Sequence, residues 1–487
     1  MGELEEEIDR EVDDPEGGGG LPSASLAAHA APSRREIRRQ TDRDIWALTW
    51  PVILSMTMAS AVGVIDIAML GRLGTETLAA VGYAMQFFFL SQAVLMAVGV
   101  ACVAMMSRAI GAGEPVRARH ALAASLVMAL ATAAVVSTTA LFFPEAPIRL
   151  LGASESIVAL AAPYFQLTIG SSLLFAVSFT YENAFRAARD ARTPMVISAA
   201  ATLVKVALNW VLIFGKFGAP ELGLVGAGLA TVGAQAIAST GFVIAARLSS
   251  HKEALRLRSG DLRAARGVYR DTVRLAVPGL LERLGMNLAL MSYFWVLGRY
   301  GPEAVAAYTV GVRVLSFSWI PGIGFSTAAS TLVGQALGAG EPRQAARAGW
   351  RATRFALVVS IVLGIGFALA REPLARFFTD DPAVLAVLMP FMVVMALSQP
   401  LLGLHFTLGG ALRGAGDTVT PLWAALVGNW ALRVPMAFGV AFVLEWSVVW
   451  VWFALSFDHL ARSVWMLVAF RRGRWAENVG ATTRSPA

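Results

Sequence analysis

The stretch WALTWPVILSMTMASAVGVIDIAML, residues 46–70, is almost entirely apolar and holds a single charged side chain, Asp66. A helix rises about 1.5 Å per residue, so this stretch is long enough to cross the ~30 Å hydrocarbon core of a bilayer. It shows no period-two alternation, and a segment in lipid must satisfy its own backbone hydrogen bonds. The stretch therefore predicts a membrane-spanning helix.

The same pattern recurs along the chain and predicts an all-α polytopic membrane protein with twelve spanning helices. They are expected near 46–70, 78–108, 120–143, 157–186, 194–214, 225–247, 271–297, 304–336, 352–370, 384–412, 420–443 and 448–470. The 487 residues are 56% hydrophobic and only 15% charged, with a mean hydropathy of +0.62. Soluble domains average about 25% charged residues, so this chain has too few charged residues to form the surface of a soluble enzyme of this length. The single cysteine, Cys102, excludes a disulfide framework and a cysteine-based metal site.

Arginine is concentrated in alternate loops. One set holds Arg117, Arg119 and the basic segment 249–268, whereas the opposite loops hold few arginines, such as Arg72. Positive charge is retained on the cytoplasmic side, so both ends of the chain are predicted to be cytoplasmic, in an inner or plasma membrane. The net charge of +7 then needs no nucleic-acid partner.

Five parts follow from this pattern. Residues 1–44 are acidic, then glycine-rich, then basic, and lack a signal-peptide core, which predicts a disordered cytoplasmic tail. Residues 45–248 are expected to form an N-lobe of six helices, and residues 249–268 a basic cytoplasmic linker. Residues 269–474 are expected to form a C-lobe of six helices, and residues 475–487 a second cytoplasmic tail.

The two lobes are related by an internal repeat at an offset of about 227 positions. The matching pieces include Gly71-Arg72-Leu73-Gly74 with Gly298-Arg299-Tyr300-Gly301, Gly111-Ala112-Gly113-Glu114-Pro115 with Gly338-Ala339-Gly340-Glu341-Pro342, and Arg186, Asp190, Thr193 and Pro194 with Arg413, Asp417, Thr420 and Pro421. Because the offset spans six helices, the lobes have the same orientation, which is one way to build a secondary transporter. A phosphate-binding G-x-x-x-x-G-K-[ST] loop is absent from the sequence. Transport would then use an ion gradient or be passive, and a channel or a scaffold remains an alternative.

These repeated pieces resemble the multidrug and toxic compound extrusion (MATE) family, with further matches at Pro51 through Asp66 and at Arg413-Gly414-Ala415-Gly416-Asp417-Thr418. The resemblance covers about residues 45–474 and is strongest to the branch with an N-lobe Asp site. It implies an exporter of amphipathic, often cationic compounds by H⁺ or Na⁺ antiport, with no enzymatic activity and no cofactor. A flippase for a lipid-linked glycan on a related fold is an alternative.

Three polar residues share one depth in the outer half of the N-lobe: Asp66, Asn209 and Thr231. A charge within hydrocarbon costs at least ~2.5–3.5 kcal/mol on insertion scales, so each such group suggests a function. The resemblance implies that these three form the proton or cation site, while a packing role for Asp66 remains the alternative. Lys205, one turn before Asn209, is expected either to pair with Asp66 or to extend towards an interface. The family often has a second Asp where this chain has Ile213, which favours H⁺ over Na⁺.

The C-lobe offers weaker candidates. Glu282, beside Arg283, could bind a cationic substrate or a second proton, and His405 and Gln399 lie on the tenth helix. His405 is either a proton carrier or a packing side chain. Separately, hinges are expected at Pro51, Gly63 and Pro278. The expected partners are small amphipathic molecules and the bilayer, with the protein acting as a monomer.

Overall fold

The computed structural model describes residues 34–477, and every regular element in that range is a helix. The long elements are α2 (Arg34–Gly71), α3 (Thr75–Gly111), α4 (Pro115–Phe142), α6 (Glu155–Gly170), α7 (Ser172–Ala187), α8 (Arg192–Phe214), α9 (Gly223–Leu248), α12 (Arg266–Leu297), α13 (Pro302–Gly338), α14 (Pro342–Leu369), α16 (Pro382–Gly414) and α19 (Val448–Arg471). A further span is built from α17 (Val419–Leu426), η3 (Val427–Arg433), α18 (Val434–Phe438) and η4 (Gly439–Val443). The short elements are α5 (Glu145–Leu150), η1 (Lys216–Gly218), α10 (Lys252–Leu255), α11 (Asp261–Ala264), η2 (Gly298–Tyr300), α15 (Arg371–Arg376) and α20 (Arg474–Glu477).

Eleven helical segments of the described chain are long and apolar enough to cross a membrane, counting α6 with α7 as one and α17 through η4 as another. The one predicted span that is not among these eleven is α12, which has 32 residues but carries charges such as Glu282 and Arg283 along its length. These charges lower its hydropathy, yet α12 still packs against α3 and α17 inside the bundle. Twelve long helical segments therefore correspond to the twelve predicted from the sequence.

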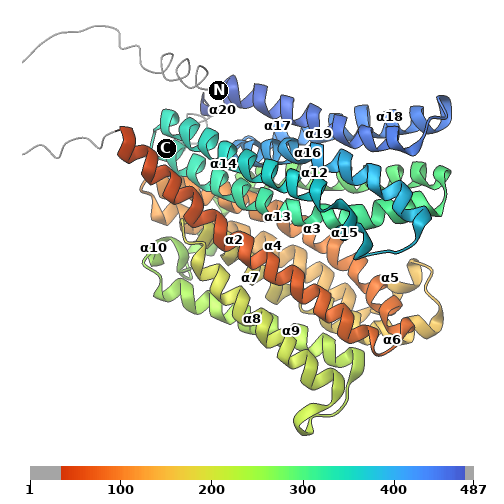
Figure 1. Ribbon diagram of the computed structural model, residues 1–487. Helices are drawn as coiled ribbons and strands as arrows, with labels where there is room; N and C mark the ends of the chain where they lie inside the picture. The colour runs from red at the N-terminus through yellow and green to blue at the C-terminus, as the bar shows by residue number, and fades with distance from the viewer. Residues whose placement is uncertain (1–33, 478–487) are drawn as a thin grey trace, which may run out of the picture.

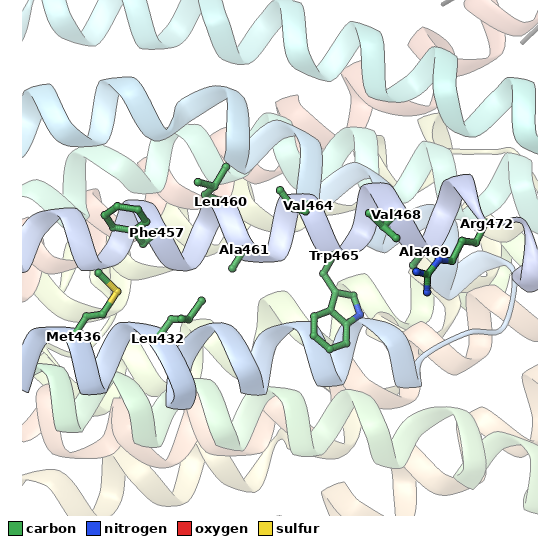
Figure 2. A pocket seen from close by; sticks show the side chains of 10 residues that line it. All are labelled: Leu432, Met436, Phe457, Leu460, Ala461, Val464, Trp465, Val468, Ala469 and Arg472. Atoms are coloured by element: carbon green, nitrogen blue, oxygen red, sulfur yellow. The ribbon is translucent and has the colours of Figure 1, made fainter. Parts of the chain in front are cut away.

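The long helices run side by side in two groups (Figure 1). Helices α2–α9 form one lobe and helices α12–α19 form the other, with α19 beside η3 and α18 at the edge of the second lobe (Figures 1 and 2). The start of α2 and the short α20 lie at the same end of the bundle, where Ile45 and Trp475 belong to one buried cluster. We call this the proximal end, which the arginine pattern predicts to be cytoplasmic, and the opposite one the distal end.

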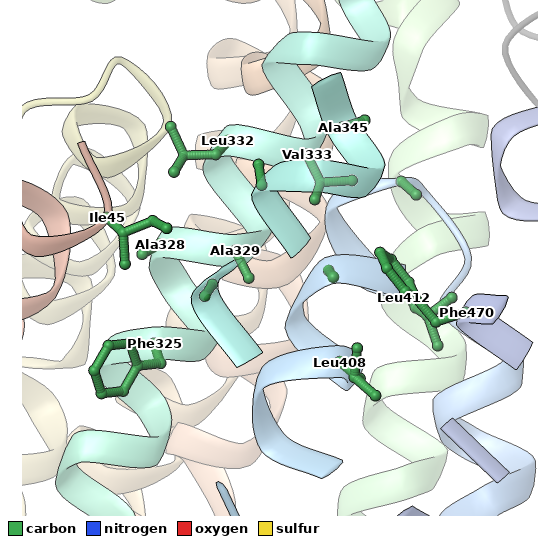
Figure 3. Close-up of a cluster of buried hydrophobic side chains, with 14 of the residues drawn as sticks. Ile45, Phe325, Ala328, Ala329, Leu332, Val333, Ala345, Leu408, Leu412 and Phe470 are labelled. Atoms are coloured by element: carbon green, nitrogen blue, oxygen red, sulfur yellow. The ribbon is translucent and has the colours of Figure 1, made fainter. Parts of the chain in front are cut away.

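An apolar core joins the two lobes in the proximal half. Ile45 of α2 is almost fully buried together with Phe325 and Leu332 of α13 (Figure 3). Leu48 of α2 belongs to the same buried cluster. The Trp46 ring meets the Phe325 ring edge-on at a centroid distance of 5.6 Å. Since each large buried apolar side chain contributes about 1.5–3 kcal/mol, this core holds the lobes together at the proximal end.

The N-terminal boundary differs from the sequence prediction, because α2 begins at Arg34 rather than near residue 45. The guanidinium of Arg351 donates to both carboxylate oxygens of Asp42, at 2.8 and 2.6 Å, and Arg189 lies 3.2 Å from Asp44. These pairs hold the first turns of α2 against α14 and the α7–α8 connection, so residues 34–44 are helical rather than part of a disordered tail. The rest of that predicted tail, residues 1–33, lies outside the described residues.

The C-terminal boundary also differs. Trp475 is only 4% exposed, its ring stacks on Phe470 at 4.7 Å, and its indole N–H donates to the Phe470 carbonyl at 2.8 Å. Burial of this ring extends the C-lobe into the predicted second tail, as far as α20. Residues 478–487 lie outside the described residues.

The segment between the lobes is tied to the N-lobe by Asp261. Arg119 of α4 donates to the Asp261 carboxylate at 2.7 Å, and the backbone amide of Arg258 donates to it at 2.6 Å. Burial raises the pKa of Asp261, but these hydrogen bonds outweigh burial and hold the pKa below its ordinary value of 3.8. The predicted linker thus contains α10 and α11, and α12 begins within it at Arg266.

Two glycines let α3 and α13 cross in close contact at the proximal end. A Cβ atom on Gly111 would lie 2.0 Å from the carbonyl oxygen of Gln335, and one on Gly338 would lie 2.0 Å from that of Arg108. Gly111 and Gly338 occupy the same position in the two repeats, and so do Arg108 and Gln335. The contact is therefore reciprocal, and only a residue without a side chain fits at either glycine.

Arg108 and Gln335 also reach across the interface between the lobes. Arg108 donates to the carbonyl of Ala415, just after α16, and Gln335 donates to that of Ala187, at the end of α7, at 2.7 Å. Each helix end thus receives a hydrogen bond from the opposite lobe. The proximal end is closed in this conformation by two pseudo-symmetric sets of contacts.

We expect Gly338→Ala to weaken this closure, because the added methyl group would overlap the Arg108 carbonyl and overpacking typically costs about 1–3 kcal/mol. Hydrogen–deuterium exchange should speed up at the backbone amides of residues 108–115 and 335–342. The matched control is Gly366→Ala in α14, where the same methyl group meets nothing within 4 Å. Unchanged exchange in Gly338→Ala would contradict the tight crossing.

Candidate functional site

Asp66, Lys205 and Asn209 meet near the distal end of the N-lobe, and we call them the N-lobe polar cluster. Asn209 donates through Nδ2 to Oδ1 of Asp66 at 2.6 Å, and the Lys205 ammonium forms an ion pair with Oδ2. The Lys205–Asp66 contact that the sequence left open is present in this conformation. Both oxygens of the carboxylate therefore have a donor.

Helix geometry explains the cluster. Lys205 and Asn209 are four residues apart on α8, which places them on one face, and α8 packs against α2, where Asp66 lies. The Asp66 side chain is 16% exposed and that of Lys205 is 26% exposed, whereas Asn209 is buried. The cluster is neutral as an ion pair, and a proton on Asp66 would remove the attraction that holds Lys205.

Thr231, the remaining predicted member of this site, has no hydrogen bond to the cluster within the described residues. The Thr231 hydroxyl donates to the carbonyl of Ala227 on its own helix, at 3.0 Å. Ile213, at the position of the second family Asp, is fully buried in the N-lobe core. Tyr164 of α6, which the sequence did not single out, is almost fully buried in the same N-lobe core as Ile213.

Asn209 retains an unused acceptor. Its Oδ1 atom is buried and has no hydrogen-bond partner among residues 34–477. An unpaired buried acceptor costs about 1–3 kcal/mol, so a donor arriving at this point would be bound favourably. A protonated Asp66 side chain would be such a donor, and its carboxyl group already contacts the Asn209 side-chain amide.

In the C-lobe, Glu282 is held by a partner that the sequence did not indicate. Arg413, at the proximal end of α16, donates through one guanidinium nitrogen to both oxygens of Glu282, at 2.6 and 2.9 Å. Arg413 belongs to the repeated, family-like stretch of the sequence, in which nothing indicated a partner on the seventh predicted span. Glu282 is therefore engaged in this conformation rather than free for a cationic substrate.

The repeat clarifies this pair. Arg186 is the N-lobe counterpart of Arg413, and it pairs with Glu182 one turn earlier on its own helix. The C-lobe has Gly409 in place of that glutamate, and a Cβ there would lie 3.2 Å from the Arg413 guanidinium. Arg413 has no such local partner and pairs with Glu282 of α12 instead, so within the described residues it makes a bond between helices that Arg186 does not make.

His405 and Gln399 both bond to their own helix. The Nδ1 atom of His405 lies 2.9 Å from the Leu401 carbonyl, so this nitrogen carries the proton, and its ring stacks on His459 at 5.4 Å. The Gln399 amide donates to the Met395 carbonyl at 3.2 Å. Within the described chain no hydrogen bond joins either residue to Glu282.

A buried ionic cluster packs η3 against α19. Arg433 and Arg462 both donate to Asp458, and the two bonds from Arg462 measure 2.6 and 2.9 Å. Asp458 is fully buried. Pro435 lacks a backbone N–H, and the wider π-helical turns of η3 just before it change the register that brings Arg433 inward. Ion pairs therefore join these three residues inside the C-lobe.

The predicted hinge residues lie within continuous helices. Helix α2 runs through Pro51 and Gly63 without a break, and α12 runs through Pro278. A Cβ on Gly63 would meet no other protein atom within 4 Å, so no neighbouring helix packs tightly against α2 at this position. Their hinge role stays a prediction.

Similarity to known proteins agrees with these features. The family described as MatE matches twice, at residues 51–211 and 278–438, which reproduces the offset between the two lobes. A probable multidrug resistance protein NorM of Thermotoga maritima is 28% identical over 444 residues, covering 90% of this chain and 94% of the relative. An FAD transporter of Shewanella oneidensis is 26% identical over 396 residues, covering 79% of this chain and 87% of the relative.

Solved structures share the fold. A Vibrio cholerae MATE transporter superposes with a TM-score of 0.82 at 21% identity, over 91% of this chain and 99% of that one. A transporter of the MOP superfamily from Pyrococcus furiosus superposes with a TM-score of 0.80 at 20% identity, over 91% and 97%. The repeated match, the full-length relatives and the shared two-lobe fold lead to one conclusion: this chain belongs to the MATE family of membrane transporters, which are not enzymes.

Proposed function

We propose that this protein is a secondary active multidrug exporter of the cytoplasmic membrane, driven by inward H⁺ flow through Asp66. The observation that carries the proposal is the ion pair between Asp66 and Lys205 inside a membrane-spanning lobe. Several full-length relatives are named as multidrug resistance proteins, which supports efflux of small amphipathic molecules. Each chain holds both lobes, so a monomer is sufficient for transport.

In the proposed cycle, closure of the proximal end exposes the substrate site to the distal side. A proton entering from that side neutralises Asp66, and Lys205 is released because its partner is no longer charged. The attraction between α2 and α8 weakens, and the Asn209 amide can accept the hydrogen bond of the protonated carboxyl. Rearrangement of α2 then lets the lobes rock and open the proximal end.

Two features favour H⁺ over Na⁺. The Lys205 ammonium already occupies the cation position beside Asp66, so Na⁺ would have to displace a tethered charge. A fully buried Ile213 supplies no oxygen where the family often has a second carboxylate. Proton transfer needs only one accessible carboxyl, whereas Na⁺ binding needs several oxygen ligands.

Arg283 supports a second substrate class, amphipathic anions, beside the cations that the family resemblance implies. It lies one turn after Gly279, whose Cβ would be 3.7 Å from Ala97 of α3, so it shares the α12 face that meets the N-lobe. Within the described residues Arg283 forms no close ion pair, and the carboxylate of its neighbour Glu282 is bound by Arg413. One relative is named as a transporter of FAD, a phosphate-bearing molecule.

Everted membrane vesicles containing the full chain test both points, with an amphipathic cationic dye and an anionic dye of similar size. An imposed pH gradient should drive dye movement, and an imposed Na⁺ gradient alone should not. Transport driven by Na⁺ alone would refute proton coupling. If anions are carried, Arg283→Gln should slow the anionic dye severalfold and leave the cationic dye unchanged; equal effects on both dyes would remove the anion assignment.

A further inference from the structure

A groove of about 630 Å³ runs along the outer side of α19, between that helix and the segment formed by η3 and α18. Leu432 and Met436 line one wall and Phe457 and Trp465 the other, and Arg472 lies at the proximal end (Figure 2). Apart from Arg472, the lining is apolar. The groove is therefore apolar along its length, with one positive charge at its proximal end.

The groove opens away from the protein interior. Asp458 and Arg462 mark the buried face of α19, whereas Val464 and Trp465 in the groove are 50% and 42% exposed. Helices α18 and α19 lie at the edge of the bundle (Figure 1). In a membrane-spanning segment, such an exposed apolar face contacts lipid.

The dimensions fit one lipid chain in one leaflet. Phe457 and Arg472 are separated by a helical length of about 22 Å. Half of the hydrocarbon core is about 15 Å thick, so an acyl chain reaching Phe457 would place its headgroup near Arg472. Trp465 lies between them, about 10 Å from Arg472 along the helix, where tryptophan is favoured at the membrane interface.

The charge at the proximal end is available for a ligand. Arg472 is exposed, and within residues 34–477 its guanidinium has no ion pair or hydrogen bond. The Trp465 indole N–H likewise has no acceptor in the described chain, so it can donate to an ester carbonyl. Basic groups beside an apolar groove at a helix end are the usual recognition elements for anionic lipid headgroups.

We propose that this groove is a binding site for an anionic phospholipid of the proximal leaflet. The phosphate contacts Arg472, the Trp465 indole donates to the glycerol ester region, and one acyl chain fills the channel between α19 and η3–α18. Bound in this way, the lipid covers the seam between the last two spans. The assignment does not depend on the coupling ion or on the exported compound.

Native mass spectrometry of the full-length protein, titrated with phosphatidylglycerol or phosphatidylcholine of identical acyl chains, tests the site. We expect Arg472→Ala to weaken phosphatidylglycerol binding about fivefold, the value of about one basic residue near a lipid surface. Phosphatidylcholine binding should change much less. The matched control is Arg471→Ala, which removes the same charge one residue away from a position that does not line the groove.

A second variant, Ala461→Trp, fills the groove with a large ring and should reduce binding of both lipids. Three results would overturn the proposal: equal losses in Arg471→Ala and Arg472→Ala, unchanged lipid binding in Ala461→Trp, or a dimer that Ala461→Trp dissociates, which would make a second copy the occupant. Thermal unfolding of each variant distinguishes loss of the site from loss of the fold.

Discussion

Replacing Asp66 with Asn will abolish proton-driven export while the protein still inserts and folds. An imposed pH gradient of about 1.7 units supplies about 2.3 kcal/mol per proton, enough for about 50-fold accumulation against a gradient. The amide cannot take up a proton at working pH, so accumulation should fall from that range to no net gradient. Dye accumulation in vesicles with an imposed pH gradient is the measurement.

The decisive comparison is the double variant Asp66→Asn with Lys205→Met, which removes both charges of the ion pair. If Asp66 is the proton carrier, this variant recovers the stability lost by leaving Lys205 unpaired but remains unable to couple transport. If Asp66 only holds α2 against α8, transport returns together with stability, and the coupling role is wrong. Wild-type accumulation in the single variant would equally exclude a coupling role for Asp66.

Asp458→Asn will lower the free energy of unfolding by about 3–5 kcal/mol, because breaking a buried ion pair leaves uncompensated charge. Arg433 and Arg462 both donate to this fully buried carboxylate, and the neutral amide cannot balance either guanidinium. Thermal or chemical unfolding in detergent measures the change. The effect should appear on stability at every pH at which Asp458 would otherwise be ionised.

Asp380→Asn is the matched control, since Asp380 is exposed in a connection near the distal end and such a change usually alters stability by less than about 0.5 kcal/mol. Replacing all three members by apolar side chains, as in Asp458→Leu with Arg433→Met and Arg462→Met, should recover most of the loss. A stability for Asp458→Asn equal to that of the control would show that the cluster is not a structural element.

The spans and the two lobes could be predicted from the sequence because both leave local signals. A helix in lipid needs about 20 apolar residues in succession, and a duplication keeps Gly111 and Gly338 in register. Even α12 could be recognised, despite Glu282 and Arg283, because the offset of about 227 positions between the repeats aligns it with the first predicted span. The limits of the tails could not be predicted, since the first turns of α2 are stabilised by Arg351, far along the chain.

The N-lobe polar cluster was partly predictable. Lys205 and Asn209 share a face of one helix by their spacing, and a lone Asp66 within hydrocarbon needs a partner. Thr231 has the same depth but bonds to its own helix, because depth does not determine which way a side chain points. Rotation of each helix about its axis is set by packing, and the sequence carries little information about it.

The order of residues is enough to establish that this chain crosses a membrane repeatedly as two equivalent lobes, because hydropathy and duplication are properties of consecutive residues. The folded bundle was needed to show that Arg413 takes Glu282, that Gly111 and Gly338 close the proximal end, and that Asp458 joins two arginines. The first two contacts join different helices more than a hundred positions apart, and Asp458 joins Arg462 of its own helix to Arg433 of η3. These contacts depend on where the helices cross and how each is turned, which follow from the packing of the whole bundle.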